Sequence, residues 1–257
     1  MTAGRLSIGI DVGGSGIKAA VVNVETGELL GERIRVKTPQ PSTPERCIAT
    51  MREVVGTLAA ARPLAPDVPV GVGIPGVTVD GTVHTAANLD SNWLGFRAEE
   101  AIAAALGRRT AIVNDADAAG IAEMRFGAGR GRSGTVLVIT LGTGIGSALF
   151  RDGRLVPNTE LGHIEIHGRD AEHRAAAASR ERRHLTWQQW APDVDEYLRR
   201  IDMLLWPDLI ILGGGVSKEA DKFLPLLTAR PMIVAAELRN EAGIVGAAMV
   251  GADPPGS

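Results

Sequence analysis

The chain has 257 residues, of which 45% are hydrophobic and 22% charged, and its formal net charge is −3. This is ordinary globular composition, and the near-neutral charge excludes a general attraction to nucleic acid or to an anionic membrane surface. A single cysteine excludes an internal disulfide and a thiolate zinc site. No apolar run approaches the ~20 residues that span a bilayer, and the N-terminus lacks a signal peptide's apolar core. We therefore expect a cytoplasmic protein.

Strands and helices are expected to alternate along the chain. Three apolar runs, over 6–11, 16–24 and 29–37, are separated by glycine-containing turns, which predicts an antiparallel meander. Thr43 followed by Pro44 is typical of a helix start, with Thr43 as N-cap. The apolar residues that follow at helical spacing are Cys47, Met51, Val54 and Leu58. The lone cysteine is therefore expected in the core rather than as a nucleophile.

The second part of the chain repeats the opening pattern. The segments DVGGSGIK (11–18) and TLGTGIGS (140–147) both place a glycine-rich turn between two strands, which indicates an internal duplication. A shift in composition near Asp115 predicts a small N-terminal domain over 1–114 and a larger one over 115–240. Residues 241–257 are expected to form a closing helix and tail that could pack back on the small domain. The other expected strands span 68–75, 110–115, 135–141, 145–150 and 209–212, and the other expected helices span 97–106, 117–126, 242–250 and a segment after Ser217.

Both glycine-rich turns could bind phosphate. Glycine lets a ligand approach the backbone closely, and successive amides form an anion-binding concavity, although such turns can also be simple tight turns. The P-loop pattern is missing, and the second turn runs into a strand rather than into the helix that a dinucleotide fingerprint needs. A glycine turn between two strands is instead typical of the phosphate clamp of actin and hexokinase, in which two hairpins face one another across an interdomain cleft.

Asp11 and Lys18 flank the first of these turns. A carboxylate beside a polyphosphate would be repelled unless a divalent cation lay between them, and Mg²⁺ binds one or two carboxylates together with phosphates and water. Lys18 would act as a counter-charge for the phosphate. The alternatives are an Asx-type turn residue for Asp11 and a solvated strand residue for Lys18.

Six segments together resemble the ROK family of sugar kinases, in the family's order and over nearly the whole chain. They are DVGGSGIKAAVV and LGTGIGSALF (the two phosphate motifs), VNDADAAGIAE (the catalytic segment), ELGH (the sugar signature), LIILGGGVSK (the adenosine-side glycine motif) and NEAGIVGAAMV (the closing helix). The resemblance implies an α/β, actin-like ATPase (ribonuclease H-like) two-domain sugar kinase fold with an interdomain cleft.

The resemblance also implies roles for individual residues. Asp115 would be the general base that takes the proton from the sugar hydroxyl, or alternatively a helix N-cap, although Asp117 is the better candidate for that cap. The sugar would be bound by Asn88, Asn114, Asp115, Glu160, His163 and Glu172. The phosphates would be bound by Asp11, Gly13, Gly14, Ser15, Gly16, Lys18, Thr140, Gly142, Thr143 and Gly144, and the nucleotide by Gly213, Gly214 and Gly215. Trp93 could pack beneath Asn88 or belong to the core.

Within the family, the segment from Arg125 to Glu172 is similar to the polyphosphate glucokinases. This implies transfer from polyphosphate, and from ATP, to the 6-hydroxyl of glucose, with Mg²⁺ as cofactor and a homodimer as the assembly. The alternatives are an ATP-dependent kinase of another hexose (mannose, fructose or an amino sugar) and a non-catalytic ROK-type sugar sensor. Three arginines before the second phosphate motif could guide polyphosphate or belong to a solvated loop: Arg125, Arg130 and Arg132.

Many ROK proteins carry a cysteine-rich zinc motif after the E-x-G-H signature, and this chain lacks those cysteines. No zinc site is therefore expected, while Glu172 matches the glutamate that ends the motif. His163 and His167 are four residues apart, but the Ile-Glu-Ile alternation between them predicts a strand that would separate them by about 13 Å. The spacing therefore argues against a histidine metal site.

Overall fold

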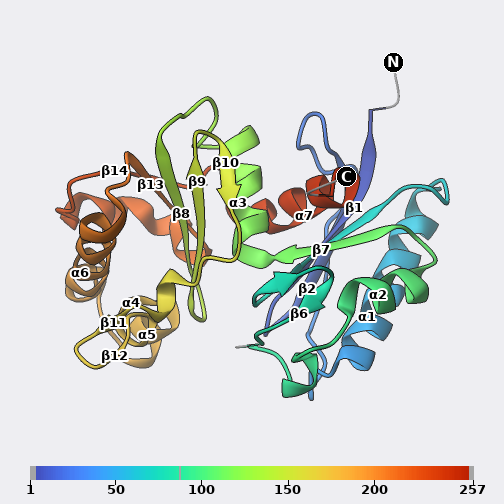
Figure 1. Ribbon diagram of the computed structural model, residues 1–257, viewed down its shortest axis with the longest axis horizontal. Helices are drawn as coiled ribbons and strands as arrows, with labels where there is room; N and C mark the ends of the chain where they lie inside the picture. Colours follow the sequence, from blue (N-terminus) through green and yellow to red (C-terminus); the bar gives the residue numbers. More distant parts are fainter. Residues whose placement is uncertain (1–3, 87, 255–257) are drawn as a thin grey trace. The chain divides into compact units, whose positions relative to one another are not determined.

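The computed structural model describes residues 4–86 and 88–254. The chain divides into two compact units. Unit 1 is made of two segments, one that ends at Ala122 and one that begins at Glu241. Unit 2 spans Glu123–Asn240. Each unit is an α/β structure around its own five-stranded sheet (Figure 1). The domain limits drawn from the sequence stay a prediction.

The sheet of unit 1 has the strand order β3-β2-β1-β4-β7. Strands β1, β2 and β3 are antiparallel neighbours, whereas β4 and β7 continue the sheet in parallel with β1. The strands span Leu6–Val12 (β1), Ile17–Asn23 (β2), Ile34–Val36 (β3), Val70–Ile74 (β4) and Thr110–Asn114 (β7), and the main helices span Pro44–Ala61 (α1), Ala98–Leu106 (α2) and Ala242–Ala252 (α7).

The start of α1 and its apolar stripe are as predicted. Thr43 has extended backbone angles at the N-cap position and Pro44 opens the helix, although the Thr43 side chain forms no capping hydrogen bond. All four stripe residues are buried, and Cys47 is fully enclosed, which confirms its place in the core. The strand expected over 29–37 is shorter in the structure, because Gly31 takes a φ of +101° and the ladder forms only from Ile34.

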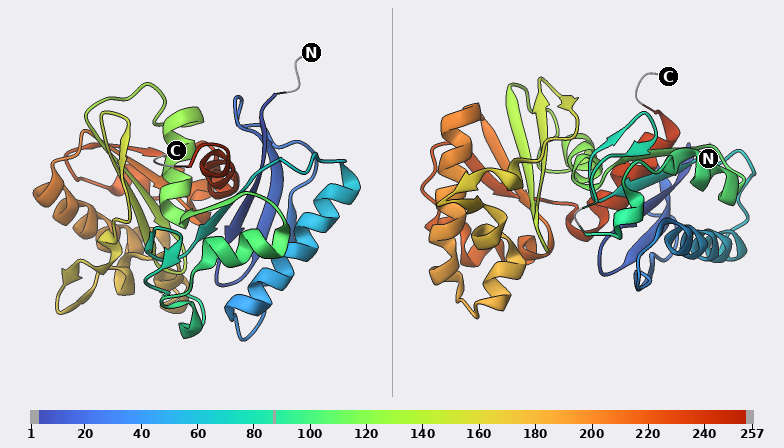
Figure 2. Two further views of the ribbon diagram at one scale, coloured as in Figure 1. Left: turned by 45° about the vertical axis from the view of Figure 1, so that its right-hand side comes forward. Right: turned by 60° about the horizontal axis from the view of Figure 1, so that its bottom comes forward.

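Helix α7 packs very closely on the sheet of unit 1, against β1 and β4 (Figure 2). Two strand glycines permit this approach. A Cβ on Gly9 would lie 1.9 Å from the carbonyl oxygen of Ile244, and one on Gly71 would lie 1.6 Å from that of Ala247. A larger residue at either strand position would force the helix away from β1 and β4, whose carboxyl ends lead into the candidate site.

The sheet of unit 2 has the order β10-β9-β8-β13-β14 and repeats the design of unit 1. An antiparallel hairpin is again extended in parallel by later strands, which confirms the duplication predicted from the two glycine-rich turns. The strands span Thr135–Leu141 (β8), Ile145–Arg151 (β9), Arg154–Val156 (β10), Leu209–Gly213 (β13) and Met232–Ala235 (β14). Helix α6 (Trp187–Leu205), which begins with a Thr186–Gln189 capping box, buries Trp190 and Tyr197 in the core beside this sheet.

Short elements connect these parts. The helix expected after Ser217 is wrong in type, because Gly215–Lys222 forms a kinked 3₁₀ segment with non-helical angles at Glu219. Within residues 4–86 and 88–254, no helix is both long and apolar enough to cross a membrane. The remaining elements are β5 (Thr78–Val79), β6 (Thr82–Val83), η1 (Ser91–Trp93), α3 (Asp115–Phe126), η2 (Leu161–His163), β11 (Glu165–Ile166), β12 (Arg169–Asp170), α4 (Glu172–Ala175), α5 (Ala177–Arg182), η3 (Gly215–Lys222), η4 (Leu224–Leu226) and η5 (Arg239–Glu241).

Candidate active site

The first glycine turn joins β1 to β2 in unit 1. Its ends are tied by a hydrogen bond from the Gly13 amide to the Gly16 carbonyl at 3.0 Å, and Thr38 donates its hydroxyl to the Gly13 carbonyl. In the described part of the chain, the amides of Gly14 and Ser15 have no hydrogen-bond partner. Two adjacent amides without partners form the kind of concavity that binds an anion.

Asp11 and Lys18 lie opposite one another at the base of this turn. They are register partners of β1 and β2, and Lys18 Nζ lies 2.7 Å from Asp11 Oδ2. The two side chains are only 15% and 28% exposed, so Lys18 is paired rather than solvated. The pair places a carboxylate and a cation on the two strands that lead into and out of the turn.

Asn88 lies next to the first turn. A Cβ on Gly14 would lie 3.1 Å from the Asn88 carbonyl oxygen, so the two backbones are in close contact, and Asn88 itself is exposed. Trp93 belongs to the core instead, because it is fully buried and its indole nitrogen donates to the Ser42 carbonyl at 2.8 Å.

Asn114 and Asp115 stand where β7 passes into α3. The buried Asn114 side chain accepts hydrogen bonds from the amides of Ala116 and Asp117 at 2.9 and 3.0 Å, and its amide group donates to the Gly76 carbonyl at 3.1 Å. Asn114 is therefore the residue that caps α3, and the assignment of the cap to Asp117 is wrong because the helix already begins at Asp115. This leaves the half-buried Asp115 on the first turn of the helix, and its carboxylate accepts from the Ala116 amide at 2.9 Å.

The second glycine turn joins β8 to β9 in unit 2. The Gly142 amide donates to the Gly144 carbonyl at 2.9 Å, and the Gly142 carbonyl accepts from the Ala178 amide of α5 at 3.0 Å. Glu172 is held against this turn, because its Oε2 accepts the Ile145 amide at 3.1 Å. The predicted sugar ligand Glu172 and the predicted phosphate turn therefore lie side by side within unit 2.

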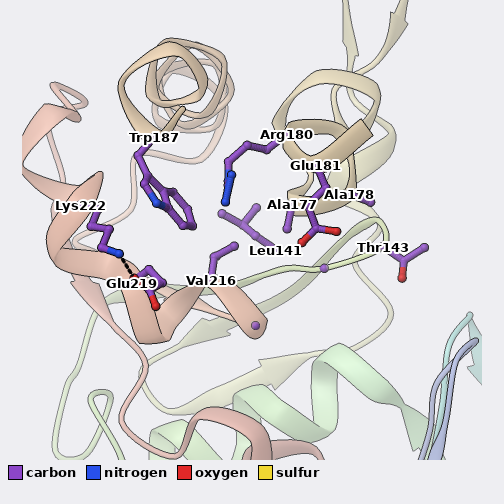
Figure 3. A pocket seen from close by; sticks show the side chains of 12 residues that line it. Leu141, Thr143, Ala177, Ala178, Arg180, Glu181, Trp187, Val216, Glu219 and Lys222 are labelled. Atoms are coloured by element: carbon purple, nitrogen blue, oxygen red, sulfur yellow. Dashed lines mark ion pairs between the residues drawn. The ribbon is translucent and has the colours of Figure 1, made fainter. Parts of the chain in front are cut away.

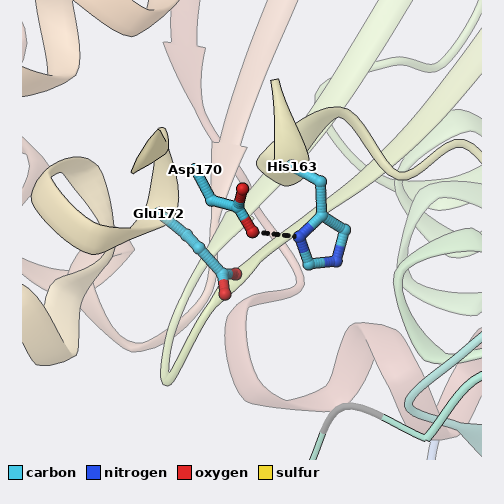
Figure 4. Close-up of side chains that lie close together, drawn as sticks. All are labelled: His163, Asp170 and Glu172. Carbon is cyan, nitrogen blue, oxygen red and sulfur yellow. Dashed lines mark hydrogen bonds and ion pairs between the residues drawn. The ribbon is translucent and has the colours of Figure 1, made fainter. Parts of the chain in front are cut away.

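His163 lies close to the carboxylates of Asp170 and Glu172 (Figure 4). Its Nδ1 donates to Asp170 Oδ2 at 2.9 Å, and its Nε2 lies 3.7 Å from Glu160 Oε2. The hydrogen bond to Asp170 raises the pKa of His163 above its usual value, with further contributions from the charges of Glu172 and Glu160. Burial raises the pKa of Glu160. The sequence predicted Glu160, His163 and Glu172 but missed Asp170, which the β11–β12 hairpin brings back to the histidine.

The one metal-compatible group found among the described residues is made of His163, Asp170 and Glu172, whose donor atoms lie within 4.8 Å of one another. His167 is not part of it. It occupies the hairpin turn with a φ of +55° and pairs with Glu196 at 2.7 Å. The strand expected between the two histidines is limited to Glu165–Ile166.

A pocket of about 610 Å³ opens beside the second turn in unit 2 (Figure 3). Its lining joins this turn, through Gly142 and Thr143, to Gly215 of the predicted nucleotide motif. Gly213 is the register partner of Thr140, which explains why the two motifs meet. No sequence motif predicted the rest of the wall, where the Arg180 guanidinium lies 3.8 Å from the centre of the Trp187 ring.

The three arginines considered for polyphosphate all lie in unit 2. Arg125 is in the last turn of α3, where it lies 5.9 Å from the centre of the Phe126 ring. Arg130 and Arg132 follow in the turns that lead to β8, and all three side chains are exposed. Their role stays a prediction.

The chain is similar to several known proteins in sequence and in structure. The model of the ROK family matches residues 7–178. The polyphosphate glucokinase of Mycobacterium tuberculosis is 50% identical over 249 residues, which cover 96% of this chain and 92% of that protein. The crystal structure of inorganic polyphosphate/ATP-glucomannokinase from Arthrobacter sp. strain KM matches with a TM-score of 0.92 and 54% identity, covering 95% of this chain and 97% of that one.

A third relative is a ROK family glucokinase from Streptomyces griseus, solved in complex with glucose and AMPPNP. It matches with a TM-score of 0.82 and 27% identity over 96% of this chain and 99% of its own. These likenesses confirm the actin-like two-domain kinase fold expected from the motifs. The chain belongs to the ROK family.

Proposed function

We propose that this protein is a glucokinase that transfers a phosphoryl group from inorganic polyphosphate, and from ATP, to the 6-hydroxyl of glucose. The 50% identity to a polyphosphate glucokinase over 96% of the chain is the observation that carries the proposal. The two glycine turns, each with a carboxylate on or against its hairpin, support it because the backbone amides of such a turn can bind phosphate without contacting a base.

Asp115 is the general base of the proposed reaction. The base must remove the proton of the sugar hydroxyl as that oxygen attacks phosphorus, and a positioned carboxylate contributes about 10²–10⁴-fold. Its place on the first turn of α3, fixed by the Asn114 cap, presents the carboxylate from a rigid element. A half-buried carboxylate with one oxygen held by the Ala116 amide has a defined orientation toward its substrate.

The sugar is held by groups that both donate and accept hydrogen bonds. The residues proposed to bind it are Glu160, His163, Glu172, Asn88, Asn114 and Asp115. A hexose offers only hydroxyl groups, so a site whose donors and acceptors pair with those groups rejects analogues that leave one of them unpaired. Specificity for the hexose therefore resides in these polar side chains rather than in an apolar pocket.

The donor phosphates are bound by the glycine turns, and Asp11 is the residue that would hold Mg²⁺. Its carboxylate is a hard oxygen ligand on the strand that leads into the turn of Gly14 and Ser15, which fits the way Mg²⁺ is bound in kinases, by few carboxylates together with phosphate oxygens. The bound ion would neutralise charge on the transferring phosphoryl group. Lys18 keeps the Asp11 carboxylate in place and adds a cation to the same turn.

ATP would use the pocket of unit 2 that joins the second turn to Gly215. Polyphosphate has no base to place there, so the pocket would serve only one of the two donors. The homodimer implied by the family resemblance is part of the proposal, and sedimentation of the full chain tests it.

The decisive assay incubates the purified protein with glucose, Mg²⁺ and nucleotide-free polyphosphate and measures glucose 6-phosphate. We expect product with polyphosphate and with ATP, and a rate at least about a hundredfold lower with the Asp115→Asn variant. Product with ATP alone would make the protein an ATP-dependent kinase, and product only with mannose, fructose or an amino sugar would change the substrate. Glucose binding without product from either donor would identify a sugar sensor.

A further inference from the structure

A short hairpin after the sugar signature brings one more carboxylate to His163. Strands β11 and β12 are only two residues each, and the turn between them consists of His167 and Gly168, both with positive φ. Positive φ at both central positions is the geometry of the tightest hairpin turns. The ladder continues with a hydrogen bond from the Ala171 amide to the Ile164 carbonyl at 2.9 Å. The hairpin therefore brings the Asp170 side chain back to His163.

The contact with Asp170 determines which nitrogen of His163 is available to a ligand. A carboxylate accepts hydrogen bonds, so the 2.9 Å contact places a proton on Nδ1. Nε2 is then the only ring nitrogen left for a substrate, and it lies on the side of Glu160, 3.7 Å from Oε2. Fixing one ring nitrogen through a hydrogen bond is the usual way in which proteins set the tautomer and the orientation of a functional histidine.

We propose that Asp170 is a positioning residue of the sugar site, which holds the His163 ring so that Nε2 and the Glu160 carboxylate together bind one hydroxyl group of the hexose. The inference rests on the proposed function, because it gives Glu160 and His163 a sugar to bind. It adds a residue that neither the glycine turns nor the E-L-G-H segment contains.

The charges around the ring support this arrangement. The groups that face His163 are the carboxylates of Glu160, Asp170 and Glu172, and the pKa of the imidazole is raised first by the hydrogen bond to Asp170. When the ring carries a proton on Nε2 as well, this nitrogen donates while Glu160 accepts, so the pair can then satisfy both the oxygen and the proton of one hydroxyl group. Asp170 therefore affects ground-state sugar binding and leaves the proton transfer to Asp115.

A double-mutant cycle on glucose affinity tests the coupling. Asp170→Ala should raise the Kd and the KM for glucose about tenfold, the lower end of the effect of losing a hydrogen bond to a charged group. The kcat at saturating glucose and the KM for polyphosphate should change less than about threefold. In a His163→Ala background the same substitution should have no further effect, because Asp170 acts only through the ring. Additive losses would overturn the proposal.

Two further variants separate positioning from folding. Asp170→Asn keeps an oxygen that can accept from Nδ1 and should restore most of the glucose affinity, whereas an Asn variant as weak as Asp170→Ala would count against a role in orientation. Glu165→Gln is the matched control, since this exposed carboxylate is the register partner of Asp170 on the same hairpin. It should leave the glucose KM unchanged, and a tenfold loss there would mean that any disturbance of the hairpin is enough.

Nitrogen NMR of the His163 ring gives a readout that needs no sugar. The wild type should show a protonated Nδ1, and Asp170→Ala should lose this state while its thermal unfolding stays within a few degrees of the wild type. A ring signal that changes on treatment with EDTA would assign Asp170 to a metal site with Glu172 and overturn the proposal. If the NMR result holds but the protein phosphorylates no hexose, the proposed function fails and the positioning of the ring stands.

Discussion

Replacing Asp115 by Asn separates the proposed chemistry from the structure that supports it. Asn is nearly isosteric with Asp, and its Oδ1 can still accept the Ala116 amide, which now lies 2.9 Å from the carboxylate. The start of α3 is capped by two hydrogen bonds to Asn114, which the substitution leaves in place. The substitution should therefore remove the base and leave the fold intact.

The expected loss of turnover is about 10²–10⁴-fold, the range for a positioned general base. At 1.36 kcal/mol per factor of ten, this corresponds to about 2.7–5.4 kcal/mol of transition-state stabilisation. The cost in folding stability should stay below about 0.5 kcal/mol, as for a substitution that creates neither a cavity nor an unpaired buried group. Binding of glucose should remain measurable.

Asn114→Ala is the matched counterpart one residue earlier. It removes the helix cap and the partner of the Gly76 carbonyl from a position that is 4% exposed. A lost cap costs about 1 kcal/mol, and a buried unpaired acceptor costs about 1–3 kcal/mol. We expect a loss of roughly 2–4 kcal/mol, and Tm should fall by about 4–16 °C in a chain of this length.

Steady-state turnover at saturating glucose, calorimetric glucose binding and thermal unfolding of both variants provide the comparison. The reasoning predicts a large kinetic and small thermal effect for Asp115→Asn, and a large thermal effect for Asn114→Ala. More than about a tenth of wild-type turnover in Asp115→Asn would remove that residue from the role of base. An equally lowered Tm in both variants would show that the charge at 115 stabilises the helix.

Three further predictions concern other parts of the chain. Changing Arg125, Arg130 and Arg132 together to Gln should lower kcat/KM for polyphosphate about three- to tenfold more than for ATP, since exposed arginines act on an anionic chain mainly through their charge; equal losses with both donors would refute a role in guiding polyphosphate. Burial raises the pKa of Cys47 to about 11, so DTNB at pH 8 should label the native thiol at least about two hundredfold more slowly than the unfolded one, on thiolate fraction alone; fast native labelling would contradict its enclosure. The raised pKa of His163 adds stability that is present below about pH 6.5 and is lost as pH rises through the folded value; the Tm difference between wild type and His163→Ala should therefore be larger at pH 6 than at pH 9, and the reverse order would show that the ring is not held by its carboxylates.

The parts of the site that are local in sequence were predictable. The glycine turns follow directly from the residues between two strands, and the side chains that flank the first turn, Asp11 and Lys18, become partners because a hairpin pairs its own neighbours. The start of α3 was harder, because Asn114, Asp115 and Asp117 can all cap a helix. In the structure Asn114 is the cap. It is the last residue of β7, and its side chain accepts hydrogen bonds from the amides of Ala116 and Asp117.

The two glycine turns show why the rest of the site could not be predicted in the same way. They occupy corresponding places in their sheets, yet at the second turn Thr140 stands where Asp11 stands at the first, and its register partner is Gly146. The strand residues that flank the second turn are therefore uncharged. The charge beside this turn comes from Glu172, which accepts a hydrogen bond from the amide of Ile145, 27 residues earlier in the chain. Asp170 reaches His163 only because of the two-residue turn at His167 and Gly168, which the hydrophobic pattern of the sequence does not predict. Duplication therefore preserved the backbone of the two glycine turns, while the charges beside them come from neighbouring residues of the hairpin in unit 1 and from a residue distant in sequence in unit 2.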